Sequence, residues 1–298
     1  MDYSQILSQQ FNIKEEYAKN IITLLDDGNT IPFIARYRKE MHGSMDDQLI
    51  REFAEKLEYL RGLDKRRDEI RSLIDAQEKL NDEINLALDK AATLSELEDI
   101  YRPYRPKRKT RASIAKEKGL EPFANDILKQ EKGFDPSKSS VDYIDEEKGV
   151  TSVEDAIQGA MDIIAELVSD NAEIRKRIRN LTNANGVLVS VATDEEKDSV
   201  YKNYYDYKEP VKKIAGHRVL AVNRGEKEGF LKVSVETDSE KPLNSIFRAM
   251  ITDKNQLCSD IIREACTDAY QRLIYPSIER EVRNDLTDVA AENAMKVF

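Results

Sequence analysis

The chain has 298 residues, a length that predicts about two domains at ~150 residues each. Charged residues make up 35% of it, against ~25% in an average domain. Only 11 residues are glycine and 8 are proline, so we expect long helices with solvated outer faces. The sequence shows no apolar run of about 18 residues that could span a membrane and no signal peptide at its start. Its net charge of −10 argues against a chain wrapped in nucleic acid, although the distribution of charge matters more than the sum.

Two cysteines, Cys258 and Cys266, are too few for a disulfide scaffold. They lie eight residues apart in a helical pattern, about 12 Å of rise, which is too far for a bridge between them. We therefore expect reduced thiols in a cytoplasmic protein.

Apolar side chains recur at helical spacing through the first hundred residues. The predicted helices cover 12–25, 32–38, 44–60, 65–77, 82–91 and 93–100. Ser44 is expected to cap the third of these and Asn81 the fifth, and either Thr93 or Ser95 is expected to begin the last. The last three are short and closely spaced, which is typical of a helix-turn-helix unit. Three helices that pack without any nucleic acid would give the same pattern, so that alternative stays open.

Helices also dominate the rest of the chain. They are predicted over 111–119, 152–168, 174–181, 255–274 and 276–298. A polar loop is expected over 131–150. The last helix has neither a cap nor a stop signal, which suggests that the chain is cut from a longer one.

Three short β-branched runs predict strands at 187–191, 217–222 and 230–235. The last two flank residues 223–229, which we expect to form a hairpin-like turn, and a tyrosine-rich segment covers 196–208. The predicted fold is mainly α, a multi-helix architecture with a helix-turn-helix-like module and a small antiparallel sheet.

We expect three regions in this fold. Residues 1–64 would form a helical N-terminal region that packs with 131–298. Residues 65–130 would form the helix-turn-helix-like module with a basic loop, and 131–298 would hold the sheet and the long C-terminal helices.

Positive charge is most concentrated in residues 101–111, called here the basic segment. Its cations are Arg102, Arg105, Lys107, Arg108, Lys109 and Arg111, and it contains no carboxylate. Arginine offers forked donors to phosphates and lysine offers point charges, and released counterions supply the free energy. Tyr101 and Tyr104 could stack with unpaired bases, and Pro103 and Pro106 are expected to hold the arginines before them extended. The alternative is a loop that clamps an acidic face of the same protein.

Two shorter basic clusters follow. Arg36, Arg38 and Lys39 surround Tyr37 and combine the same kinds of side chain, although a helix that uses Arg36 in internal salt bridges is the alternative. The cations of 175–179 are expected to lie on the solvated side of an amphipathic helix.

No enzyme motif is visible. The sequence lacks Gly-x-Gly-x-x-Gly, a Walker-type Gly-Lys-Ser/Thr, Cys-x-x-Cys and His-Glu-x-x-His. His42 and His217 are far apart and are expected to be structural, and Cys258 and Cys266 lie on a predicted core face. We therefore expect no catalytic residue, no metal site and no cofactor.

Three stretches together resemble the Tex family of bacterial transcription accessory proteins, which are relatives of a eukaryotic transcription elongation factor. They are Thr-Ile-Pro-Phe-Ile-Ala-Arg-Tyr-Arg-Lys-Glu at 30–40, residues 97–111 with 115–122, and His-Arg-Val-Leu-Ala-Val-Asn-Arg-Gly-Glu at 217–226, and residues 278–286 also match. The resemblance implies a helical N-terminal region with a helix-turn-helix-like module. In the family an RNase H-like domain, helix-hairpin-helix units and an S1 domain that binds nucleic acid come next, and none of these follows in this sequence. The resemblance assigns no catalytic residue.

The leading hypothesis is a non-enzymatic N-terminal region of a Tex-like transcription accessory protein. Its basic Tyr-Arg-Pro loop would contribute weak, salt-sensitive, sequence-independent binding of RNA or DNA. The alternative is a protein-interaction scaffold that docks on the transcription machinery or on the missing domains. The candidate nucleic-acid-binding residues are Arg36, Arg38, Tyr101, Arg102, Tyr104, Arg105, Lys107, Arg108, Lys109 and Arg111.

Overall fold

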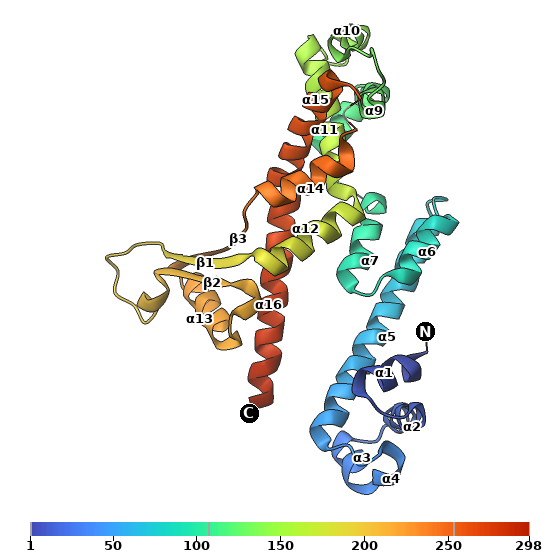
Figure 1. The fold of residues 1–298 in the computed structure, drawn as a ribbon, viewed down its shortest axis with the longest axis vertical. Coiled ribbons are helices and arrows are strands. Elements are labelled where there is room, and N and C mark those ends of the chain that lie inside the picture. The colour runs from blue at the N-terminus through green and yellow to red at the C-terminus, as the bar shows by residue number, and fades with distance from the viewer. Residues whose placement is uncertain (1, 107, 253, 298) are drawn as a thin grey trace. The chain divides into compact units, whose positions relative to one another are not determined.

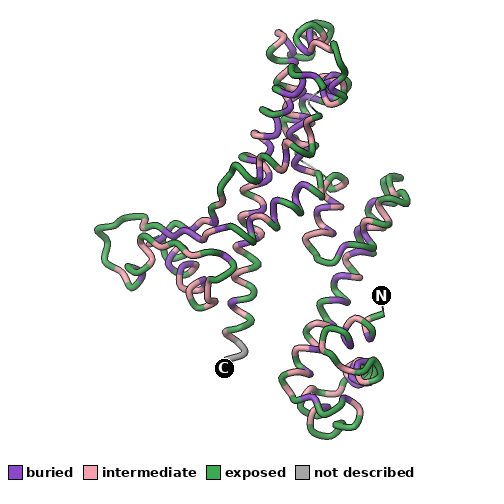
Figure 2. Tube along the Cα trace, viewed as in Figure 1, coloured by how far each residue is buried: buried purple, intermediate pink, exposed green. Residues whose placement is uncertain are grey.

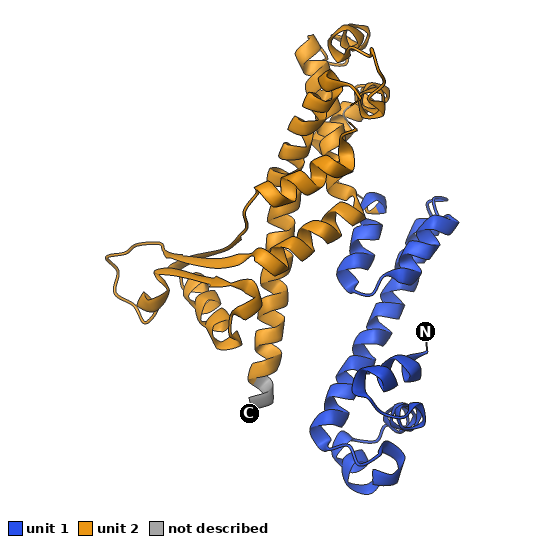
Figure 3. Ribbon diagram, viewed as in Figure 1, with its two compact units in different colours: residues 1–104 blue, residues 105–298 orange. Residues whose placement is uncertain are grey.

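A computed structural model of the chain describes residues 2–106, 108–252 and 254–297. The chain forms two compact units, residues 1–104 (unit 1) and 105–298 (unit 2) (Figure 3). The three regions expected from the sequence divide the chain differently and stay a prediction. No helix in the described ranges is both long enough and apolar enough to cross a membrane.

Unit 1 contains helices and no strand among its described residues. Its elements are α1 (Tyr3–Phe11), α2 (Glu15–Asp26), α3 (Ile31–Tyr37), α4 (Lys39–His42), α5 (Asp47–Asp75), α6 (Asp82–Lys90), α7 (Leu94–Tyr101) and a 3-10 turn (Arg102–Tyr104) (Figure 1). The side chain of Asn81 accepts a hydrogen bond from the first turn of α6, as the sequence predicts, and of the two candidates Thr93 and Ser95 it is Thr93 that caps α7. Helix α1 was not expected.

Helix α5 is one helix of 29 residues where the sequence predicts two. It begins after Asp46, whose carboxylate accepts the amide hydrogen of Leu49 at 2.8 Å, and not at Ser44, which has a left-handed backbone (φ 65°). Buried side chains continue along the whole helix, so no break separates its two halves (Figure 2). The first half packs with α1 to α4 around Ile50 and Phe53, and the second half packs with α6 and α7.

A buried arginine joins the second half of α5 to α6. Arg67 is 5% exposed, and its guanidinium donates to the carbonyl oxygens of Leu88 at 2.8 Å and Ala91 at 3.0 Å. These carbonyls lie at the C-terminal end of α6, where the last carbonyl groups lack the regular partner four residues on, although that of Leu88 also accepts the amide hydrogen of Ala91 at 3.3 Å. Arg67 also pairs with Asp64 one turn earlier. The three helices form one core, while their likeness to a helix-turn-helix unit stays a prediction.

Unit 2 is mainly helical, with one small sheet, so the predicted fold class is confirmed. Its elements are α8 (Arg111–Glu117), α9 (Glu121–Lys129), α10 (Pro136–Ser139), a 3-10 turn (Ser140–Tyr143), α11 (Val153–Asp170), α12 (Ala172–Asn185), β1 (Val187–Ala192), a 3-10 turn (Lys202–Tyr204), β2 (Asp206–Pro210), a 3-10 turn (Val211–Lys213), α13 (Gly216–Lys227), β3 (Leu231–Glu236), α14 (Glu240–Met250), α15 (Gln256–Asp268), a π-helical segment (Ala269–Ile274) and α16 (Tyr275–Val297). Helices α9 and α14 were not expected. The predicted loop 131–150 contains α10, a 3-10 turn and a β-bridge between Asp145 and Val150.

The sheet has the antiparallel order β2-β1-β3, and one of the three predicted strands is wrong. Residues 217–222 belong to α13. The segment 223–229, predicted as a hairpin turn, continues this helix to its last residue, Lys227, and includes the two residues that follow. Val219 and Val222 are both buried, and their spacing of three suits a helix packed on one side. The missing strand is β2, at the end of the tyrosine-rich segment.

Pro276 does not begin a helix, because α15, the π-helical segment and α16 follow one another without a break (Figure 1). A proline inside a helix donates no hydrogen bond, and its ring crowds the carbonyl group four residues earlier. The wider turn of Ala269–Ile274 lies directly before Pro276, and the amide of Tyr275 donates to Tyr270, five residues back. This widening gives the proline ring room.

The prediction for the cations of 175–179 is wrong for two of them. Arg175 is fully buried and Arg179 is 8% exposed, whereas Lys176 and Arg177 do face solvent. Both buried guanidinium groups bind Glu281 of α16, with nitrogen-to-oxygen distances of 2.7 and 2.8 Å. This pairing across about a hundred residues joins α12 to α16.

Candidate nucleic-acid interface

The chain passes from one unit to the other inside the basic segment. Residues 101–104 end unit 1, and 105–111 begin unit 2. The two parts therefore have separate surroundings. Lys107 lies outside the described residues.

In unit 1 the tyrosines of the basic segment are packed. Tyr101 is 6% exposed and belongs to the core of α5, α6 and α7, with the guanidinium carbon of Arg66 5.8 Å from its ring centre. A ring at this depth is closed to a nucleic-acid base. Tyr104 is half-buried, and burial, followed by the charge of Glu83, raises the pKa of its hydroxyl. Its carbonyl oxygen accepts a hydrogen bond from Gln77 at 2.9 Å.

The arginine between these tyrosines is not extended, which corrects the expectation from Pro103. Arg102 has helical backbone angles (φ −50°, ψ −45°) and starts the 3-10 turn that ends unit 1. The packing of Tyr101 and Tyr104 on either side fixes this turn, which outweighs the local preference of a residue before proline.

In unit 2 the described cations of the basic segment are exposed. Arg105, Arg108, Lys109 and Arg111 all face solvent. The Lys109 ammonium lies 3.5 Å from Glu117, but both side chains are about two-thirds exposed (67% and 65%), so the pair is weak. Arg108 has neither an ion pair nor a hydrogen bond to any described side chain.

The end of the basic segment is fixed to the body of unit 2. Thr110 caps α8 in a capping box with Ser113, and its hydroxyl donates to Glu166 of α11 at 3.0 Å. One turn away on α11, burial raises the pKa of Asp162, although the positive charges of Arg111 and Arg272 oppose the shift. The charge of Arg111 therefore acts on an acid of its own unit, although neither Arg111 nor Arg108 makes an ion pair with a described residue.

Unit 1 presents a second group of cations, on α3 and the start of α4. Arg36, Tyr37, Arg38 and Lys39 are all exposed. Arg36 makes no ion pair within the part of the chain that the structure describes, so its predicted alternative role in internal salt bridges finds no support.

The sequence analysis did not identify Phe33 as a member of this group. Its ring centre lies 5.3 Å from that of Tyr37, and the guanidinium carbon of Arg38 lies 5.6 Å from the Phe33 ring centre. The signal that could have identified it is the spacing of four residues between Phe33 and Tyr37, which places both rings on one side of a helix.

The two histidines have different surroundings, and both cysteines are buried. His42 is fully buried, with Nε2 3.0 Å from the carbonyl oxygen of Ile34, and His217 is exposed on α13. Cys258 and Cys266 are buried as predicted, and burial raises the pKa of Cys266 to about 12. Within the described ranges, no group of three or more histidine, cysteine or acidic side chains could hold a metal ion.

Known proteins resemble the whole chain. The family model "Tex central region-like" matches residues 131–298, and "Tex-like protein N-terminal domain" matches residues 1–75. The chain is 42% identical to "Uncharacterized protein YdcI" of Bacillus subtilis, covering 100% of this chain and 42% of that protein. It is 34% identical to "Transcriptional accessory protein Tex" of Neisseria gonorrhoeae (100% and 40%) and 30% identical to "S1 RNA-binding domain-containing protein 1" of Homo sapiens (100% and 31%). The chain therefore spans less than half the length of these relatives.

Proposed function

We propose, from the premise that this chain belongs to the Tex family, that its basic segment gives a transcription accessory protein sequence-independent contacts to RNA or DNA. The observation that carries the proposal is the exposure of Arg108 and Lys109 in a chain of net charge −10. Arg105 adds a third exposed cation within five positions.

The chemistry of this contact is electrostatic. Arg108 can offer its guanidinium fork to a phosphate, and Lys109 can leave Glu117 for a phosphate because their exposed pair costs little to break. Nothing in 105–111 offers a stacking ring, so the segment would contact the backbone and not the bases. Three phosphate contacts on a single strand predict a slope of log K against log salt of about −2. The proposed role is non-enzymatic.

A protein-interaction scaffold is the second candidate. The observation that favours it is the partial neutralisation of the segment, since Lys109 lies near Glu117 and the charge of Arg111 acts on Asp162. In that role the basic segment would clamp its own unit, and the acidic helices would dock on proteins.

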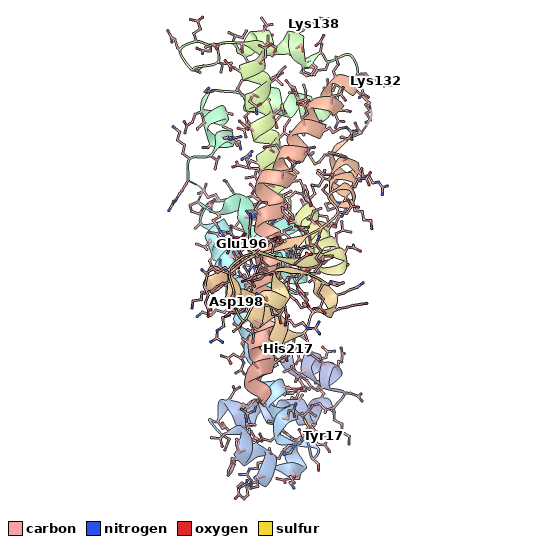
Figure 4. The ribbon with its side chains drawn as sticks, turned by 90° about the vertical axis from the view of Figure 1, so that its left-hand side faces the viewer. Tyr17, Lys132, Lys138, Glu196, Asp198 and His217 are labelled. Carbon is pink, nitrogen blue, oxygen red and sulfur yellow. The ribbon has the colours of Figure 1, made fainter. Side chains whose placement is uncertain are left out.

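Reversal of charge in the basic segment tests the proposal. We expect Arg108→Glu with Lys109→Glu to weaken the binding of a labelled single-stranded oligonucleotide by about tenfold at low salt, measured by fluorescence anisotropy on the whole chain. The matched control is Lys132→Glu with Lys138→Glu, which changes the net charge equally. Figure 4 shows both control lysines at the end of unit 2 that is farthest from Glu196 and His217. Equal losses in the two variants would refute a local contact, and salt-independent retention of protein partners without nucleic acid would favour the scaffold.

A further inference from the structure

We propose that the exposed side chains of Phe33, Arg36, Tyr37, Arg38 and Lys39, called here the α3 surface, stack with unpaired bases and make unit 1 select single-stranded over duplex nucleic acid. This inference deepens the proposed function and rests on it for the class of ligand, but it uses residues of the other unit.

The two rings are the first observation. Phe33 is 37% exposed and Tyr37 is 61% exposed, and their planes are tilted by 42° at a centroid distance of 5.3 Å. Large aromatic rings are usually buried, and exposed ones are enriched where a protein binds a partner. One face of Phe33 is occupied by the guanidinium group of Arg38, so Tyr37 is the ring with more surface to offer.

Charge around the rings is the second observation. Arg36 lies directly before Tyr37 and Lys39 lies two residues after it, and neither has an ion pair to a described residue. Glu40 is the single carboxylate in 30–40. Aromatic rings beside unneutralised cations suit a strand whose bases are free to stack and whose phosphates lie next to them.

A second exposed tyrosine of unit 1 shows what the α3 surface has in addition. Tyr59 on α5 is 43% exposed, and the Lys56 ammonium lies 4.8 Å from its ring centre. Its neighbours in the sequence include Glu55 and Glu58, both exposed, so its surroundings would repel phosphates. Tyr59 is therefore a matched control for an exposed ring with a cation but without a net positive surface.

Unit 1 holds the α3 surface in a fixed position. The Thr30 hydroxyl accepts the amide hydrogen of Phe33, and Ile34, in the same turn of α3, is fully buried. His42 contacts the carbonyl oxygen of Ile34, and Asn20 of α2 donates to the carbonyl oxygen of Met41 at 3.1 Å. The backbone that carries the rings and cations is thus fixed before any ligand arrives, which lowers the entropy cost of binding.

Base stacking separates this ligand from two others. A duplex hides the faces of its bases, so it can use the cations of the surface but not the rings. An acidic peptide can likewise pair with Arg36 and Lys39, and the loss of one ring would change its affinity little. The effect of Tyr37 on single strands alone is therefore the distinguishing property.

The test uses the whole chain and labelled single-stranded and duplex DNA of the same length. We expect Tyr37→Ala to weaken single-strand binding roughly tenfold and duplex binding less than about twofold. Tyr37→Phe should keep the wild-type affinity, and Tyr59→Ala should change nothing. A strand that carries 2-aminopurine should lose the fluorescence quenching caused by stacking when Tyr37 becomes alanine.

Each outcome has one meaning. Equal losses for both kinds of DNA, no loss for either, or an equal loss for a labelled polyglutamate peptide would overturn the inference. If Arg108→Glu with Lys109→Glu weakens binding and Tyr37→Ala does not, the inference fails and the proposed function stands. If only Tyr37→Ala weakens binding, the role of the basic segment fails and the α3 surface stands. If the wild-type chain binds no nucleic acid, both fail.

Discussion

Removal of the Glu281 carboxylate should destabilise unit 2 by leaving two buried cations without their shared anion. Glu281 accepts hydrogen bonds from Arg175 at 2.7 Å, from two nitrogens of Arg179 at 3.0 and 2.8 Å, and from Ser277 at 3.1 Å. Breaking a buried pair by removing one partner costs about 3–5 kcal/mol. The negative charge of Asp285 also interacts with Arg179 and would remain in the variant. The expected cost of Glu281→Ala is therefore near the lower limit, at about 3 kcal/mol.

Thermal unfolding followed by circular dichroism measures this cost. A loss of about 3 kcal/mol should lower the Tm of a unit of this size by roughly 6–12 °C. The matched control is Arg177→Ala on the same helix α12, where an exposed pair with Glu173 at 3.1 Å should contribute less than about 1 kcal/mol. If Glu281→Ala lowers the Tm no more than this control does, the reasoning about buried charge is refuted.

The same network has a pH dependence whose sign follows from the pKa of Glu281. Burial by itself would raise this pKa, but the hydrogen bond from Arg179 and the charge of Arg175 outweigh it and hold the pKa below its usual value. The carboxylate therefore contributes stability that is complete above its pKa in the unfolded chain and is lost as the pH falls through the lower, folded value. Glu281→Ala should abolish this part of the acid sensitivity.

Two further predictions concern packing and thiol chemistry. Gly225→Ala should destabilise unit 2 by about 1–3 kcal/mol in urea titrations, because the new Cβ would lie 2.5 Å from Leu231 of β3. The control is Gly62→Ala on α5, where a new Cβ would meet no atom within 4 Å. An equal change in the free energy of unfolding for both variants would contradict the prediction. Cys266, whose pKa is raised to about 12 by burial, should not react with a thiol reagent at pH 8 in the folded chain and should react once urea unfolds it; rapid reaction in native buffer would show that the core opens locally.

The strands show where the sequence pattern was insufficient. A run such as Val219 to Val222 has β-branched residues that suit a strand and also a spacing that suits a helix. The choice was made by packing: Val222 lies in the core between α13 and the sheet, and Gly225 lets β3 approach the helix closely. Residues 206–210 form the edge strand β2 instead. Their side chains alternate only between exposed and half-buried, which is a weak strand signal.

The candidate site was foreseen in part. Its residue types and their concentration in 101–111 and 36–39 are properties of the sequence alone, and the exposure of Arg36, Arg38, Arg108 and Lys109 agrees with that prediction. The roles of individual residues could not be foreseen, because each depends on distant partners. Tyr101 is buried by α5 and α6, and the charge of Arg111 acts on Asp162, about fifty residues away in the chain.

The sequence by itself determined the features that act over three or four residues. Asn81 caps the helix that it was predicted to cap, and Thr93, one of two predicted candidates, caps the next, because a side chain and the amide it binds are neighbours in the chain. Only the tertiary structure decided which charges are buried and which helices are continuous. Arg175 can lie in the core because Glu281 of α16 pairs with its guanidinium group. Helix α5 continues without a break because one hydrophobic core packs against its first half and another against its second half. The free energy of burial depends on area removed from water by the whole fold, which no local pattern contains.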